Sequence, residues 1–300
     1  MKLEDLQSFA IAGHVSFTQF NADTIVMEIS NAACSASIVM QGAHLIHWQP
    51  KDCEQPVVWL SSDATFARGK SIRGGIPICW PWFGPHETRG DVPAHGYART
   101  VEWSIVNCQQ VSDELTEISF RLIENEHSRA MWPYQTDCIY SLKIGATLEL
   151  QLVTINESDQ SVVLGEALHT YFNIGEIENV RVLGLDHGDY YDKVADRMAR
   201  QQGAIEFNAE TDRVYMNTIA GCTIEDPQLN RRIHIDKTGS QSTVVWNPWQ
   251  GKADAMGDLG PQGWHQMVCV ETANALDNRI SLEAGQRHEM TVRYRVESME

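Results

Sequence analysis

Short segments with the composition of β-strands recur along the whole chain. They are rich in Val, Ile, Thr and aromatic residues, and turn residues separate them. Helical periodicity is weak: the best candidates, residues 63–68 and 128–131, are one or two turns long and carry no sustained apolar stripe. We therefore predict strands within residues 24–29, 37–40, 44–48, 57–60, 101–106, 116–123, 138–144, 147–155, 162–172, 180–185, 223–224, 232–235, 243–246, 267–271, 279–282 and 290–296.

Two of these predictions extend to pairing. In TLELQLVTI (147–155) leucines alternate with mostly polar residues, which is typical of a strand with one buried face. With Gly145 before it, this segment and residues 138–144 predict a hairpin. Residues 290–296 are expected to pair back onto 279–282 through the turn at 283–286.

Many short antiparallel strands without an evident linker predict an all-β fold. A chain of 300 residues is long enough for one large β-domain with an ample core. We expect a large antiparallel β-sandwich in which residues 1–300 form a single domain.

The charge balance limits the partners. The formal charge is −17, from 23 basic and 40 acidic side chains, and such a field repels nucleic acid and anionic membrane surfaces. Neither class of partner is expected. Arginines that lie together in a loop are informative against this acidic background, because they would be needed to hold an anionic substrate.

The cysteines and the N-terminal segment indicate a compartment. The seven cysteines are scattered and form no C-x-x-C pair, which is typical of free thiols in a reducing environment. The first residues lack an apolar stretch of signal length, and no window approaches 18 apolar residues. We expect a cytoplasmic protein.

The densest unusual segment is SIRGGIPICWPWFGPHETRGDVPAHGYAR (71–99). Its prolines and glycines predict turns and extended pieces instead of a regular strand or helix. Aromatic rings supply rigid apolar walls, and arginines fork onto anionic oxygens, so such a loop suits a concave binding site. The alternative is a packed surface loop that connects two sheet edges.

Three further segments carry residues that could do chemistry. His169 lies inside an apolar run, where a histidine with a satisfied core position is the usual alternative. Asp212 belongs to TDRVY (211–215), which is also compatible with a solvated turn. Glu271 ends an apolar run, and a buried carboxylate there must find a partner or a wet cavity.

Several enzyme classes lack their signatures. His44 and His47 point to opposite faces of a predicted strand, and no cysteine or carboxylate joins a histidine at a zinc spacing. The G-x-S-x-G, Walker and dinucleotide-binding glycine patterns are also missing. We predict that the protein uses neither a metal nor another cofactor.

Five motifs in order, covering about residues 20 to 296, resemble the aldose 1-epimerase (galactose mutarotase-like) superfamily. The similarity is greatest to its branch of glucose-6-phosphate 1-epimerases, the hexose-6-phosphate mutarotases. Each motif alone is weak, whereas five in sequence are specific. The resemblance implies a single large β-sandwich with the site in a cleft across one sheet. The motifs are RGGIP (73–77), HGYAR (95–99), LHTYF (168–172), TDRVY (211–215) and VETAN (270–274).

The resemblance implies a catalytic pair, with His169 as the general acid and Glu271 as the general base. The residue types suit the reaction. Interconversion of α and β anomers needs one proton delivered to the ring oxygen and one removed from the C1 hydroxyl. The open aldehyde then rotates about C1–C2 and closes on its other face. Each positioned donor or acceptor contributes about 10²–10⁴-fold.

The same resemblance implies a set of substrate contacts. Arg73 and Arg99 would bind the phosphate, Asp212 the sugar hydroxyls, and His95 would line the pocket. One departure is Ala94, where members of this branch often carry a glutamine that contacts the substrate. That polar contact is missing here or is supplied from elsewhere.

Two alternatives belong to other functional classes. One is a non-catalytic carbohydrate-binding β-sandwich; both it and the enzyme would use the rings of Trp80, Trp82 and Phe83 as a sugar platform. The other is a different sugar-phosphate isomerase, which would usually need a metal or an enediol base. A binding module has no reason to keep both His169 and Glu271. The expectation is therefore a monomeric, cofactor-independent isomerase that acts on a hexose phosphate.

Overall fold

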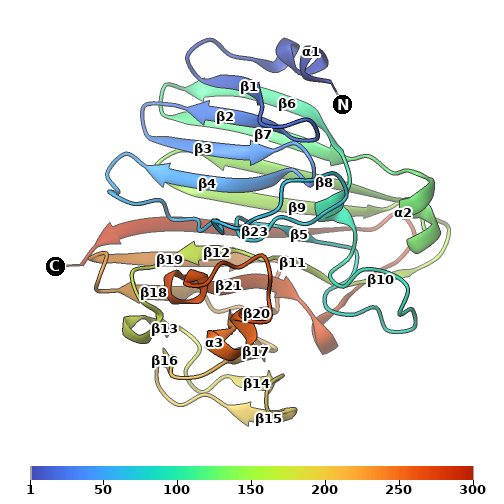
Figure 1. The fold of residues 1–300 in the computed structure, drawn as a ribbon. Coiled ribbons are helices and arrows are strands. Elements are labelled where there is room, and N and C mark those ends of the chain that lie inside the picture. Colours follow the sequence, from blue (N-terminus) through green and yellow to red (C-terminus); the bar gives the residue numbers. More distant parts are fainter. Residues whose placement is uncertain (1, 300) are drawn as a thin grey trace.

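The computed structural model describes residues 2–299, and its regular structure consists mainly of antiparallel strands arranged in two layers (Figure 1). One layer is a nine-stranded sheet that runs across the whole molecule. In spatial order it contains β16 (Ile205–Glu206), β13 (Arg181–Leu183), β18 (Cys222–Asp226), β19 (Arg231–Thr238), β23 (Arg287–Ser298), β9 (Leu148–Asn156), β8 (Thr136–Ile144), β7 (Leu115–Leu122) and β6 (Trp103–Ser112).

Two sheets make the second layer. A four-stranded sheet contains β1 (Val15–Gln19), β2 (Ile25–Ser30), β3 (Cys34–Val39) and β4 (His44–Pro50). An eight-stranded sheet contains β15 (Arg197–Arg200), β14 (Asp189–Asp192), β17 (Thr211–Tyr215), β20 (Ser242–Asn247), β21 (Met267–Asn274), β11 (Glu166–Leu168) and β5 (Ile78–Cys79), with β12 (Tyr171–Asn173) also paired to β21. The short strands β10 (Val162–Leu164) and β22 (Ile280–Leu282) pair only with each other.

The core lies between the layers. The leucines of β9 are fully buried and alternate with more exposed residues, as a strand with one covered face requires. Polar side chains also bridge the layers: Trp48 of β4 donates to the carbonyl of Gly145 at 3.1 Å, and the hydroxyls of Thr170 and Tyr294 lie 2.6 Å apart. One buried cluster contains residues from Leu6 to Tyr294.

Helices are short and peripheral. The α-helices are α1 (Leu3–Leu6), α2 (Glu126–Met131) and α3 (Trp249–Ala253); the 3₁₀ turns are Gln7–Phe9, Ala98–Thr100, Ile177–Asn179, Gly263–Gln266 and Leu276–Asn278. Among residues 2–299 no helix is long and apolar enough to cross a membrane.

The all-β prediction and the hairpin of β8 and β9 are confirmed. Two local strand predictions are wrong. Residues 57–60 make only isolated bridges at Val58 and Leu60. The segment 290–296 does not pair with 279–282. It belongs to β23, which pairs with β19 on one side and with β9 on the other. Residues 280–282 form β22, which pairs with β10. Of the two weak helical candidates, 63–68 is irregular and 128–131 lies in α2.

Residues 162–172 form three short strands instead of one. Gly165 and the pair His169–Thr170 interrupt the run, and the amide of Thr170 donates to the carbonyl of Leu168 at 2.9 Å. The amide of His169 is bound instead by the carbonyl of Pro77 at 3.1 Å. The break turns the chain at the histidine, so His169 is not an ordinary core residue of a continuous strand.

Candidate active site

One face of the eight-stranded sheet collects the predicted catalytic and sugar-binding side chains. In the strand register, Asp212 of β17 pairs with Trp246 of β20, which pairs with Cys269 of β21. Two residues further along β17, Val214 pairs with Val244, which pairs with Glu271. Because alternate residues of a strand share a face, Glu271 and Asp212 lie on the same side of the sheet. Asp212 is buried within β17, so the solvated turn considered for this segment is wrong.

His169 and Glu271 meet on this face. Their atoms Nε2 and Oε1 are 3.4 Å apart, and the residues are only 9 % and 2 % exposed. The imidazole stacks on the ring of Tyr171, with centroids 4.9 Å apart and planes 8° from parallel. His169 Nδ1 and Glu271 Oε2 are buried without a hydrogen-bond partner in the described structure. Two unsatisfied acid-base atoms side by side are costly for stability and typical of a functional site.

Burial holds both groups of the pair toward their neutral forms. It lowers the pKa of His169 well below its usual value, and the positive charges of Arg99 and Arg73 act in the same direction. Burial raises the pKa of Glu271 well above its usual value, with a further contribution from Asp212. Before a substrate binds, the pair therefore favours a neutral imidazole and a protonated carboxyl group.

Arg73 is connected to the pair through an aromatic ring. Its Nη1 donates to the hydroxyl of Tyr171 at 3.0 Å, and its Nε donates to Asp258 at 3.1 Å. Arg99 donates to the backbone carbonyl of Ala94 at 2.9 Å, and its charge lowers the pKa values of both His169 and Glu271. Both predicted phosphate-binding arginines thus belong to the electrostatic environment of the pair.

His95 lies in the loop beside His169, with ring centroids 5.8 Å apart. Its Nδ1 accepts a hydrogen bond from the amide of Gly84 at 3.3 Å. Burial, followed by the charges of Arg99 and Lys193, lowers its pKa to about 3. A neutral imidazole whose Nδ1 accepts must carry its proton on Nε2, so His95 can offer an N–H donor to a ligand.

Lys193 is a site residue that the sequence motifs did not identify. It follows β14, and its ammonium lies 3.1 Å from the carboxylate of Asp212. Its charge also reaches Glu271 and His95, whose pKa values it lowers. The strand before it, DYYD (189–192), shows no clear alternation, and no motif marked the lysine.

Trp80 was expected to contact the sugar, and this expectation is wrong. The side chain is fully buried between the layers, where its indole N–H donates to Thr154 of β9 at 3.0 Å. The ring on the site face is Trp246, whose centroid is 6.0 Å from that of His169. Its position next to Cys269 in the register follows from strand pairing, which the sequence alone does not fix. Trp82 and Phe83 line a neighbouring cavity.

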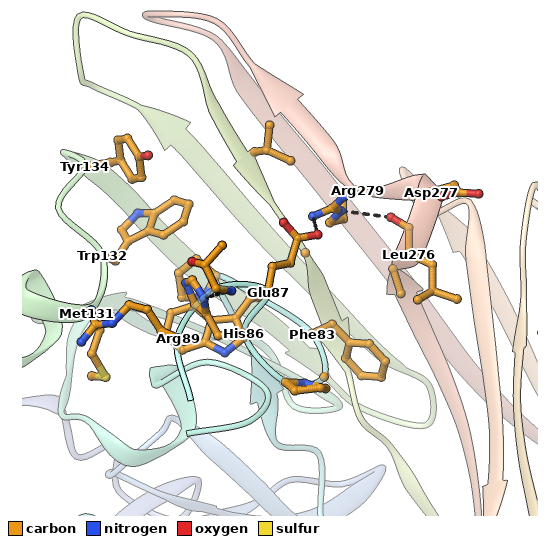
Figure 2. A pocket seen from close by; sticks show the side chains of 18 of the residues that line it. Phe83, His86, Glu87, Arg89, Met131, Trp132, Tyr134, Leu276, Asp277 and Arg279 are labelled. Atoms are coloured by element: carbon orange, nitrogen blue, oxygen red, sulfur yellow. Dashed lines mark hydrogen bonds and ion pairs between the residues drawn. The ribbon is translucent and has the colours of Figure 1, made fainter. Parts of the chain in front are cut away.

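Figure 2 shows that cavity, of about 760 Å³, with aromatic rings and arginines on its walls. Its arginines are already paired within the protein: Arg89 with Asp91 at 2.7 Å and Arg279 with Glu87. Lys193 belongs to its lining, which connects the cavity to the site face. Neither His169 nor Glu271 is among its lining residues.

Within residues 2–299, one group of side chains has atoms close enough to share a metal ion: His169, Cys269 and Glu271, within 4.8 Å of one another. Sequence spacing could not reveal it, because Cys269 and Glu271 share one face of β21 while His169 comes from a distant segment between β11 and β12. Burial keeps the pKa of the Cys269 thiol well above its usual value, so the thiol is protonated. A zinc ligand must be a thiolate, so a metal bound here would have to displace this proton.

Comparisons with known proteins agree on one family. The family model described as aldose 1-epimerase matches residues 26–295. An Escherichia coli protein named "Putative glucose-6-phosphate 1-epimerase" is 38 % identical over 86 % of this chain and 85 % of its own, and a plant protein of the same name from Cenchrus ciliaris is 35 % identical over 84 % and 78 %. A crystal structure described as a putative mutarotase from Salmonella typhimurium superposes with a TM-score of 0.89 and 33 % identity, over 96 % of this chain and 95 % of the other.

Proposed function

Because this chain belongs to the aldose 1-epimerase family, we propose that it is a hexose-6-phosphate mutarotase, which interconverts the α and β anomers of glucose 6-phosphate. The curated relatives that carry the name glucose-6-phosphate 1-epimerase support the phosphorylated substrate. The observation that carries the reaction type is the buried contact of 3.4 Å between His169 and Glu271. A non-catalytic sugar-binding module has no need for such a pair.

The pair contains one proton donor and one proton acceptor, which is what ring opening requires. His169 gives a proton to the ring oxygen while Glu271 takes the proton of the C1 hydroxyl, and the bond between C1 and the ring oxygen breaks. Rotation about C1–C2 presents the other face of the aldehyde. The two proton transfers then run backwards, and the ring closes with the opposite configuration at C1.

The charges around the pair explain why a phosphate would help the chemistry as well as the binding. Arg73 and Arg99 lower the pKa of His169 in the free protein. A phosphate dianion held by these arginines would offset their charge and raise that pKa again. The imidazole would then be protonated when the substrate is in place, as the general acid must be.

Other residues would hold the sugar. Asp212, which shares the sheet face of Glu271, and the Nε2–H of His95, whose ring lies beside that of His169, could bind sugar hydroxyls, and Trp246 offers an aromatic face. We infer that the enzyme needs no cofactor, acts as a monomer in the cytoplasm, and binds neither nucleic acid nor membranes. The formal charge of −17 supports the last two points.

Exchange NMR with glucose 6-phosphate and free glucose tests the substrate class. We expect kcat/KM to be much higher for the phosphorylated sugar. Arg73→Ala should lower kcat/KM for glucose 6-phosphate about ten- to a hundredfold, because it removes a charge-assisted contact worth about 1.5–3 kcal/mol, and should change the value for glucose much less. Arg89→Ala is the matched control, since Arg89 is bound to Asp91 and to the carbonyl of Ala130. Equal kcat/KM for both sugars would exclude the phosphate assignment.

A further inference from the structure

The reaction proposed above assigns no role to Lys193. The pairing of Tyr191 with Val214 and of Asp192 with Arg213 brings the next residue opposite Asp212. The backbone confirms this register, because the amide of Lys193 donates to the carbonyl of Asp212 at 2.8 Å. Lys193 therefore shares the face of Asp212, and its side chain closes an ion pair at 3.1 Å.

The ion pair matters because of what Asp212 does to Glu271. Two carboxylates on one buried face repel each other, and the second one resists ionisation while the first stays charged. Asp212 raises the pKa of Glu271, and Lys193 lowers it. Asp212 is itself buried, so without a partner its charge would be poorly screened by water.

We propose that Lys193 is a positioning residue that holds Asp212 in place and balances its charge, which allows Glu271 to work as the base of the mutarotase reaction. This inference rests on the proposed function and extends it to a residue that lies at the boundary between the site face and the cavity of Figure 2. A lysine suits this place because its ammonium is a compact point charge on a flexible stem.

The charged and titratable groups around Glu271 come from many elements. They are Asp212 from β17, Lys193 after β14, His169 between β11 and β12, Tyr171 from β12, Cys79 from β5, Cys269 from the same strand, Arg99 from the 3₁₀ turn and Tyr294 from the opposite sheet. Among these groups, Asp212 raises the pKa of Glu271 and Lys193 lowers it. Because the two also form a direct ion pair, they can be substituted singly and together.

The test is the pH dependence of kcat for glucose 6-phosphate in four proteins: wild type, Lys193→Met, Asp212→Asn and the double variant. Loss of the ammonium should raise the pKa of Glu271, so the acid limb of kcat should move upward by about one pH unit, a tenfold loss of rate below the limb. Asp212→Asn should move the limb downward. The double variant should lie between the two, near wild type, because both charges are gone.

Two controls separate this role from a structural one. Lys193→Arg keeps the charge and should leave the limb in place. Lys252→Met removes a surface lysine that is paired with Glu210 at 2.7 Å, and it should not change the profile. An unmoved limb in a folded Lys193→Met protein, with only kcat or the melting temperature lowered, would overturn the proposal.

A readout without substrate keeps this inference separate from the proposed function. The carboxyl carbon of Glu271, assigned by its loss in Glu271→Gln in ¹³C-glutamate-labelled protein, can be titrated by NMR. We expect a higher midpoint in Lys193→Met than in wild type. An unchanged midpoint would refute the role of Lys193 even in an active enzyme. A raised midpoint in a protein that does not interconvert anomers would instead contradict only the function.

Discussion

At the scale of single residues, the site depends on two side chains whose pKa values are shifted in opposite directions by the same cause. Burial favours the neutral form of an acid and of a base alike, so His169 loses its proton more readily and Glu271 keeps its proton longer. A pair of this kind is poised to exchange one proton across 3.4 Å. Such an arrangement is unfavourable for a merely structural contact and useful for proton transfer.

Substitution of either member should separate these roles. His169→Asn and Glu271→Gln keep approximate size and polarity, and each should lower kcat for glucose 6-phosphate by about 10²-fold or more with a modest change in KM. The double variant should lose much less than the product of the two single losses, because the pair works as a unit. Exchange NMR gives the rates, and thermal melts run in parallel show whether each variant is folded. A folded His169→Asn protein with full activity would rule out the catalytic assignment.

The aromatic residues show that the sequence alone does not determine which side chain faces the site. The loop composition marks Trp80, Trp82 and Phe83 as candidates for a sugar platform, but it cannot say which ring faces the sugar. Trp80 belongs to the core because its N–H finds Thr154 in the opposite layer. Trp246 faces the site because β20 lies between β17 and β21. This choice is made by strand order, which depends on contacts between distant segments.

At the scale of elements, the backbone conformation explains the glycines in two of the motifs that resemble the family. Gly96 has φ = +71°, and a Cβ there would lie 1.9 Å from the carbonyl oxygen of Trp80. Gly75 has φ = +69°, and a Cβ there would lie 2.5 Å from the imidazole of His44. Only glycine fits these places. The loop can therefore pack its backbone against its neighbours and present His95 and Arg99 on either side of Gly96.

Gly96→Ala should accordingly disturb both stability and the site. We expect a loss of about 1–3 kcal/mol of unfolding free energy from the strained φ alone, with a lower kcat because His95 is displaced. Gly90→Ala in the same loop is the matched control, because Gly90 lacks a positive φ and its added Cβ would meet no atom within 4 Å. Chemical denaturation measures the first effect and exchange NMR the second. Equal stability of the two variants would contradict this account of the motif.

Strand prediction succeeded where the signal was local. The hairpin of β8 and β9 follows from alternation and a short turn. The expected pairing of 279–282 with 290–296 failed because β23 finds longer partners in β19 and β9, a competition between distant segments. The strands β14 and β15 are only four residues long and contain few aliphatic residues, so they gave no apolar signal, although β14 leads into Lys193.

At the scale of the whole molecule, the nine-stranded sheet serves as the support for the site. It covers the back of the eight-stranded sheet with large buried side chains, and contacts such as Thr170 with Tyr294 fix the segment that carries His169. The front face is then free to carry polar groups. A site that is built on sheet strands is rigid, which suits a reaction that depends on positioned protons.

The protein as a whole is acidic, with a formal charge of −17, so an anionic substrate must be attracted by a local field. Arg73, Arg99 and Lys193 are the cations that act on the catalytic pair. The sequence allowed the two arginines to be identified through their motifs. It could not identify the lysine, since only the pairing of β14 with β17 brings it to Asp212.

The most direct test of the central claim, metal-independent anomer exchange by an acid-base pair, is exchange NMR of equilibrated glucose 6-phosphate with protein dialysed against EDTA. We predict that the protein accelerates exchange between the α and β anomers, and that dialysis leaves the rate unchanged, because proton transfer needs no Lewis acid. The cluster of His169, Cys269 and Glu271 makes the second part a real test. No acceleration over the uncatalysed rate, or a loss after dialysis that one divalent ion restores, would contradict it.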